Sequence, residues 1–240
     1  MTANPTNTAR LAAVLNILCF LPSGFSVQVL TKMFVRDDPA ATAARILASE
    51  SLFRLGFVSD LVAIMLFMSA MVLLYTLLAP SSRRVASIML AFVIAGSVIQ
   101  SLDAVSDVAA LLVLKGVHLP AAEAQALAYV ALRLHSALYQ LALAFFGGLA
   151  LLIGRLVLSA TFLPRWLGIF MLIDGLGYLT FSLGTFLSPA FGLHVYPILP
   201  FATAAIGELP LWLWLIVRGV DIDRWRMQAA GSAATLQPAA

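Results

Sequence analysis

The chain alternates long apolar segments with short polar breaks, and this pattern predicts membrane helices. An α-helix rises about 1.5 Å per residue, so about 20 apolar residues are needed to cross a hydrocarbon core of about 30 Å. Windows of about 19 residues meet this condition in six places. The predicted spans are Leu11–Leu30, Leu52–Leu78, Val85–Leu114, Ala124–Leu158, Phe162–Leu187 and Tyr196–Val217.

The spans define an all-α fold class, a polytopic transmembrane helical bundle with six spans. Residues 1–226 are predicted to form a single transmembrane domain. Between the first two spans, Asp38 and Pro39 supply an N-cap and a first-turn proline, which predicts a short helix over residues 40–50. Residues 227–240 are rich in Ala, Gly, Ser, Thr and Pro, and they are predicted to be a disordered tail.

Composition and charge exclude several classes of protein. Hydrophobic residues make up 62% of the 240 residues and charged residues only 10%, which excludes an ordinary soluble domain. No run of basic residues interleaved with aromatic residues occurs, so nucleic acid is not an expected partner. Cys19 is the only cysteine, which excludes an internal disulfide.

The distribution of positive charge predicts the orientation in a cell inner membrane. Six spans place both termini on one side, and cytoplasmic termini agree best with the rule that positive residues stay inside. The cytoplasmic side then carries eight arginines and the outer side five basic residues. These are Arg10, Arg83, Arg84, Arg155, Arg165, Arg218, Arg224 and Arg226 inside, and Lys32, Arg36, Arg45, Arg54 and Lys115 outside.

Five carboxyl groups interrupt the apolar spans: Asp60, Asp103, Asp107, Asp174 and Glu208. An ionised carboxylate at the centre of a membrane helix costs about 2.5 to 3.5 kcal/mol on insertion scales, so the folded protein must compensate for each of them. Such residues usually mark a pathway for ions or substrate, or a proton relay. A structural role, as a hydrogen-bonding residue between helices, is the alternative for each acid taken alone.

Depth along the helices divides these residues into two groups. Asp60, His135, Asp174 and Glu208 lie about 15 to 18 Å from the nearest loop, which predicts a common level near the middle of the membrane. Asp103 and Asp107 are predicted to lie closer to the outer surface, one turn apart on one face of the third span. Arg133 is at a similar outer depth, and we expect it to form an ion pair with Asp103 or Asp107.

Aromatic residues accompany the ionisable ones. Tyr139 shares a helix face with His135, and Tyr178 shares one with Asp174. Acidic groups with aromatic walls suit a small cationic or lipophilic compound. The predicted ligand-binding or proton-binding residues are therefore Asp60, His135, Glu208, Asp174, Tyr139 and Tyr178.

A metal site or another cofactor is not expected. Zinc and iron sites usually use several imidazoles, and the other two histidines, His118 and His194, lie in predicted outer loops. The sequence contains no H-x-x-H, H-E-x-x-H or E-x-x-H spacing.

From about Ala9 to Val220 the chain resembles the bacterial integral-membrane family called domain of unknown function 4386. The resemblance rests on the following runs: residues 41–44, 46–50 and 53–56 leading to Asp60; Leu134-His135 with residues 145–147; residues 163–168; residues 175–179; and Gly207-Glu208 with residues 213–215 and 218–220. It implies a polytopic membrane fold and no assigned reaction. Asp60, His135, Glu208 and Glu50 fall on motif positions of the family. Asp174 departs from the pattern, because the family tends to carry an acid shortly after Gly-Tyr-Leu, where this chain has Phe181.

Three functional hypotheses follow. The leading one is a membrane protein that binds or transports a small cationic or lipophilic compound, with Asp60, His135 and Glu208 changing protonation. The second is an intramembrane acid-base enzyme, an isomerase, cyclase or lyase, acting on an isoprenoid or other lipid. The third is an accessory membrane subunit with a structural polar core. The oligomeric state does not follow from the sequence.

Overall fold

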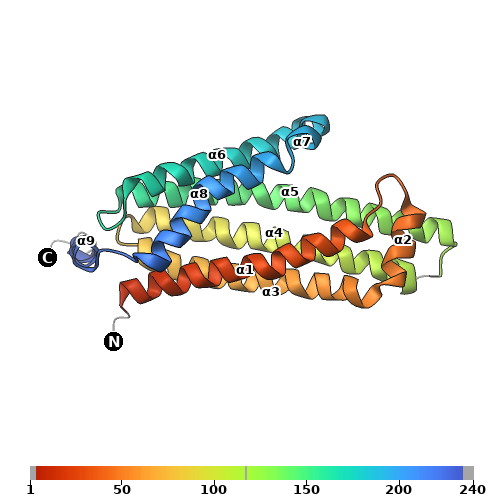
Figure 1. Ribbon diagram of the computed structural model, residues 1–240, viewed down its shortest axis with the longest axis horizontal. Coiled ribbons are helices and arrows are strands. Elements are labelled where there is room, and N and C mark those ends of the chain that lie inside the picture. The colour runs from red at the N-terminus through yellow and green to blue at the C-terminus, as the bar shows by residue number, and fades with distance from the viewer. Residues whose placement is uncertain (1–3, 117, 235–240) are drawn as a thin grey trace. The chain divides into compact units, whose positions relative to one another are not determined.

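The computed structural model describes residues 4–116 and 118–234. In this part of the chain there are nine helices and no strand, as Figure 1 shows. The helices are α1 (Pro5–Met33), α2 (Pro39–Ala48), α3 (Glu50–Leu78), α4 (Arg83–Gly116), α5 (Ala121–Ser159), α6 (Arg165–Leu187), α7 (Pro189–Val195), α8 (Ile198–Val217) and α9 (Ile222–Ala234).

The predicted fold class is confirmed. Six helices, α1, α3, α4, α5, α6 and α8, are long and apolar enough to cross a membrane, and they coincide with the six predicted spans. Many large apolar side chains on these helices face outward, for example Leu112, which is 61% exposed, and Val217, which is 68% exposed. An apolar exterior of this kind is suited to lipid rather than water. The chain is therefore a multi-pass integral membrane protein.

The short helices α2 and α9 agree only in part with what the sequence predicted between and after the spans. Asp38 caps α2 as expected, because its Oδ1 accepts a hydrogen bond of 2.8 Å from Ala41 N. The sequence predicted a disordered tail from residue 227, whereas α9 continues to Ala234. Residues 235–240 of that predicted tail lie outside the described residues.

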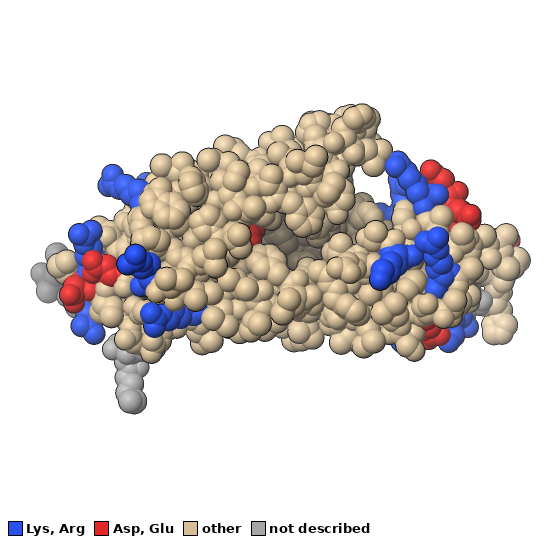
Figure 2. Space-filling model, in the orientation of Figure 1, with Lys and Arg blue, Asp and Glu red and all other residues tan. Residues whose placement is uncertain are grey.

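The chain divides into two compact units. Unit 1 comprises Met1–Ile17, Met68–Gly96 and Leu143–Ala240, and unit 2 comprises Leu18–Phe67 and Ser97–Ala142. The core of unit 2 contains Ile46, Phe53, Leu111 and Leu132, which come from α2, α3, α4 and α5. On the face shown in Figure 2, the charged side chains of unit 1 gather over α9 and the neighbouring helix ends, and those of unit 2 gather around α2.

Two pairs of glycines bring α5 and α6 into close contact in unit 1. A Cβ atom on Gly154 would lie 2.8 Å from Gly168 O, and one on Gly175 would lie 2.7 Å from Gly147 O. The spacing is seven residues on each helix, so the same face of each antiparallel helix carries both small residues. The two backbones therefore pack at a distance that a side chain would prevent.

Another close contact joins α6 to α8. A Cβ atom on Gly207 of α8 would collide with the Cβ of Asp174, and one on Gly177 of α6 would collide with the side chain of Thr203. Helix α6 is thus fixed between α5 and α8, which lie against different faces of it. This arrangement places Asp174 inside the packed helices.

A change at Gly154 tests the contact between α5 and α6. We expect Gly154→Ala to lower the free energy of unfolding by about 1 to 3 kcal/mol, because the added methyl group meets the backbone of α6. Gly24→Ala is the matched control, since a Cβ there meets nothing within 4 Å. Unfolding with a denaturing detergent, followed by circular dichroism, measures both changes. Equal effects of the two substitutions would contradict the proposed packing.

Candidate functional site

Four ionisable residues from three helices form a cluster in unit 2. His135 on α5 is central: its Nδ1 lies 3.2 Å from Asp107 Oδ1 and 3.2 Å from the backbone O of Asp103, both on α4. Asp60 on α3 is near enough for its charge to interact with those of His135 and Asp107. We call Asp60, Asp103, Asp107 and His135 the unit 2 cluster.

The carboxyl groups of the unit 2 cluster are buried and incompletely paired. Asp103 is 1% exposed, Asp107 6% and Asp60 9%. Asp103 Oδ1 has no hydrogen-bond partner within the described ranges. A protonated His135 supplies a single positive charge against three carboxyl groups. The cluster therefore carries surplus negative charge unless protons or another cation bind to it.

The helix ends explain why His135 meets Asp103 and Asp107. Helices α4 and α5 are joined by a short connection between Gly116 and Ala121, so they run antiparallel from a common end. Asp103 lies thirteen residues before Gly116, and His135 lies fourteen residues after Ala121. Both are therefore about 20 Å from that end. The sequence had assigned these residues to different depths, whereas the structure brings them together.

The predicted partner of the outer acids is not the one observed. Arg133 is exposed and forms no ion pair with Asp103 or Asp107. It lies two residues from His135 on α5, and residues two apart on a helix point to different sides. His135 takes the place that the sequence predicted for Arg133. Tyr139, one turn beyond His135 on α5, is partly buried.

The other predicted acids form a pair in unit 1. Tyr178 on α6 donates a hydrogen bond of 3.0 Å from Oη to Oε1 of Glu208 on α8. Asp174, one turn before Tyr178, is fully buried, and neither of its carboxyl oxygens has a hydrogen-bond partner in the described part of the chain. The charges of Asp174 and Glu208 interact with each other, and we call these residues the unit 1 pair.

The backbone of α8 adds polarity beside the unit 1 pair. Pro210 lies inside α8 and has no N–H, so the carbonyl of Ile206 loses the donor that a regular helix would provide. Gly207, between Ile206 and Glu208, allows Asp174 to lie directly against the α8 backbone. This role of Gly207 was not predicted from the sequence. The sequence feature that could have predicted this contact is a glycine next to an intramembrane acid.

Glu50 has a structural position at the beginning of α3. Its Oε2 lies 2.6 Å from Lys115 Nζ at the end of α4, and its Oε1 lies 2.9 Å from Arg54. These ion pairs connect two helices of unit 2 at an exposed end. Glu50 therefore does not belong to the unit 2 cluster.

No group of three or more His, Cys, Asp or Glu side chains in residues 4–116 and 118–234 is arranged to hold a metal ion. The predicted site residues thus fall into two sets. Asp60, Asp103, Asp107, Arg133, His135 and Tyr139 belong to unit 2, and Asp174, Tyr178 and Glu208 belong to unit 1. A common cavity for both sets stays a prediction.

Comparison with known families gives one match. The model of the family described as "Domain of unknown function (DUF4386)" matches residues 11–219. No curated protein matches the chain, and no solved structure does so. The family description carries no activity, so the chemistry of the two acid groups has to be inferred from their residues.

Substitution of His135 tests the observed pairing in unit 2. We expect His135→Gln to lower the free energy of unfolding by about 3 kcal/mol, because a buried carboxylate loses the group that neutralises it. Arg133→Gln, at an exposed position two residues away, should change it by less than about 0.5 kcal/mol. Detergent-induced unfolding measures both. A larger effect of Arg133→Gln would favour the pairing predicted from sequence.

Proposed function

The chain belongs to the family of domain of unknown function 4386, and from that premise we propose that it binds or transports a small cationic or lipophilic compound with linked protonation. The ligand binds within the membrane-spanning helices. Asp60, His135 and Glu208 exchange protons as the ligand enters or leaves. No cofactor takes part in this proposal.

The unit 2 cluster carries the proposal. It combines three buried carboxyl groups with one imidazole, and His135 is already close to Asp107. Neither Asp60 nor Asp103 forms an ion pair with a basic side chain in the described part of the chain. A cation that bound beside them would replace the protons that otherwise neutralise the site. Competition of this kind links ligand binding to proton release.

The unit 1 pair supports the proposed linkage between ligand binding and protonation. Asp174 is fully buried, and within the described ranges its carboxyl oxygens have no hydrogen-bond partner. It is unstable when both it and the neighbouring Glu208 are ionised, since like charges repel each other in an apolar environment. Tyr178 hydrogen-bonds Glu208 but does not neutralise it. A proton held by the pair removes the repulsion, and its release would accompany binding of a cation.

A purely structural polar core fits these residues less well. Such a core is stable when every buried polar group is paired. Asp107 and Glu208 have partners, whereas Asp103 Oδ1 and both carboxyl oxygens of Asp174 have no hydrogen-bond partner in the described structure. Unpaired oxygens of this kind are more usual in sites that bind protons or ligands.

The proposed location is the cell inner membrane, with cytoplasmic termini. In unit 1, Trp225 of α9 donates a hydrogen bond of 2.9 Å to Leu77 O, and Thr161 donates one of 2.8 Å to Gln228 of α9. Helix α9 therefore lies on the same side as the α3–α4 and α5–α6 connections. Arg83, Arg84 and Arg165 also lie there, and arginines favour the cytoplasmic side.

A lipophilic cation tests the proposal directly. Tetraphenylphosphonium is the probe, and its binding to the protein in lipid nanodiscs is measured by equilibrium dialysis at several pH values. We expect affinity to fall as the pH falls, because protons compete with the cation for the carboxylates. Asp60→Asn should lower the affinity by about tenfold, equivalent to about 1.4 kcal/mol. Glu208→Gln should weaken the pH dependence.

Asp37→Asn is the matched control, because Asp37 is an exposed acid whose side chain is 82% accessible. It should leave both the affinity and its pH dependence unchanged. Unaltered binding and pH profiles in both Asp60→Asn and Glu208→Gln would show that the proposal is wrong. Native mass spectrometry of the wild-type protein in mild detergent would identify a co-purified compound.

A further inference from the structure

A groove in unit 1 is lined by no residue of the unit 1 pair or the unit 2 cluster. It has a volume of about 520 Å³ and is lined by residues 80–83 of the α3–α4 connection and by Gln228, Gly231 and Ser232 of α9. The connection joins two membrane spans, so this groove opens where the spans leave the hydrocarbon core. Its position suits a ligand that is held at the membrane surface.

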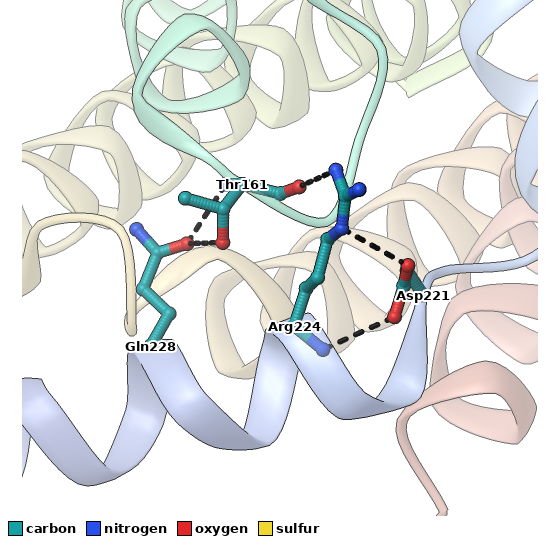
Figure 3. A network of polar contacts seen from close by, with 4 residues as sticks. All are labelled: Thr161, Asp221, Arg224 and Gln228. Atoms are coloured by element: carbon teal, nitrogen blue, oxygen red, sulfur yellow. Dashed lines mark hydrogen bonds and ion pairs between the residues drawn. The ribbon is translucent and has the colours of Figure 1, made fainter.

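Helix α9 forms one wall of the groove and is held in place by a network of polar contacts, shown in Figure 3. Gln228 Oε1 accepts two hydrogen bonds of 2.8 Å from Thr161, from its N and its Oγ1. Arg224 donates to Thr161 O at 3.4 Å and pairs with Asp221 at 3.3 Å. With the bond from Trp225 to Leu77 O, these contacts fix α9 before any ligand binds.

The positive charge of the groove favours an anionic ligand. Arg83 is the only charged residue among the described residues that line it, and it forms no ion pair with any of them or with the rest of the described chain. Ser81 Oγ, next to it, is buried and has no hydrogen-bond partner there either. Apart from Asp174 and Glu208, the charged residues of unit 1 are eight arginines and two aspartates. The surroundings are therefore strongly positive.

We propose that this groove binds the phosphate-containing headgroup of an anionic phospholipid, with Arg83 as the principal contact. Arginine is the side chain best suited to phosphate, because its guanidinium group presents several donors in one plane. Lipid is the source of the phosphate because the groove opens at the membrane surface and because Met227, which precedes the lining residue Gln228 on α9, is 67% exposed. An exposed methionine among arginines suits an interface between headgroups and acyl chains.

Lipid binding to the full-length protein tests the proposal. The protein is delipidated in mild detergent and titrated with phosphatidylglycerol or with phosphatidylcholine of the same acyl chains, and native mass spectrometry measures the bound fraction. We expect phosphatidylglycerol to bind more tightly. Arg83→Gln should weaken its binding by about fivefold, the effect expected of one basic residue at an anionic surface.

Two further variants separate the groove from general charge. Arg165→Gln is the matched control, because Arg165 begins α6 as Arg83 begins α4 but does not line the groove. It should leave the affinity unchanged. Gly231→Leu adds a side chain where a Cβ meets nothing within 4 Å, so it should fill the groove and weaken binding without altering charge or packing.

Four results would overturn the proposal. They are equal affinity for the two lipids, equal losses in Arg83→Gln and Arg165→Gln, unchanged binding in Gly231→Leu, and displacement of the lipid by inorganic phosphate at comparable concentration. The last result would identify a site for free phosphate instead. Circular dichroism and gel filtration confirm that each variant is folded.

Discussion

The contact of α6 with the backbones of α5 and α8 is the constraint on which the interior of unit 1 depends. Membrane helices gain little from the hydrophobic effect within lipid, so close packing and polar contacts must hold them together. Glycines provide this packing at two levels between α5 and α6 and at Gly207 of α8. Because Asp174 lies in the same layer, the packing also buries a carboxyl group whose oxygens have no hydrogen-bond partner among the described residues.

The unit 2 cluster and the unit 1 pair offset the free-energy cost of burying their carboxyl groups in different ways. In the unit 2 cluster, an imidazole on α5 lies beside a carboxylate of α4, and further acids surround the pair. In the unit 1 pair, Glu208 accepts a hydrogen bond from a neutral phenol, Tyr178. An ion pair offsets desolvation through opposite charge, whereas a hydrogen bond from a phenol offsets it only in part. Both groups therefore need protons or a cation to be stable in lipid.

Sequence predicted the spans well because hydropathy is a property of each segment alone. All six spans were found in this way, and the Asp38 cap of α2 was found from the local Asp-Pro sequence. The partners of the buried acids were predicted less well. Arg133 and His135 differ by two positions on α5, and only the rotation of α5 against α4 decides which of them faces Asp107. Helix α9 was also missed, because its polar residues become ordered through contacts with the α3–α4 and α5–α6 connections.

The sequence by itself therefore determined that the chain is a six-span membrane protein and that it carries acids whose burial requires compensation, since both follow from local transfer energies. Tertiary structure decided which residue compensates which acid. In the folded protein, His135 pairs with Asp107, and Asp174 lies against Gly207. The partner of a side chain depends on helix rotation and on the distance between backbones. Neither quantity is encoded in the hydropathy of a single span.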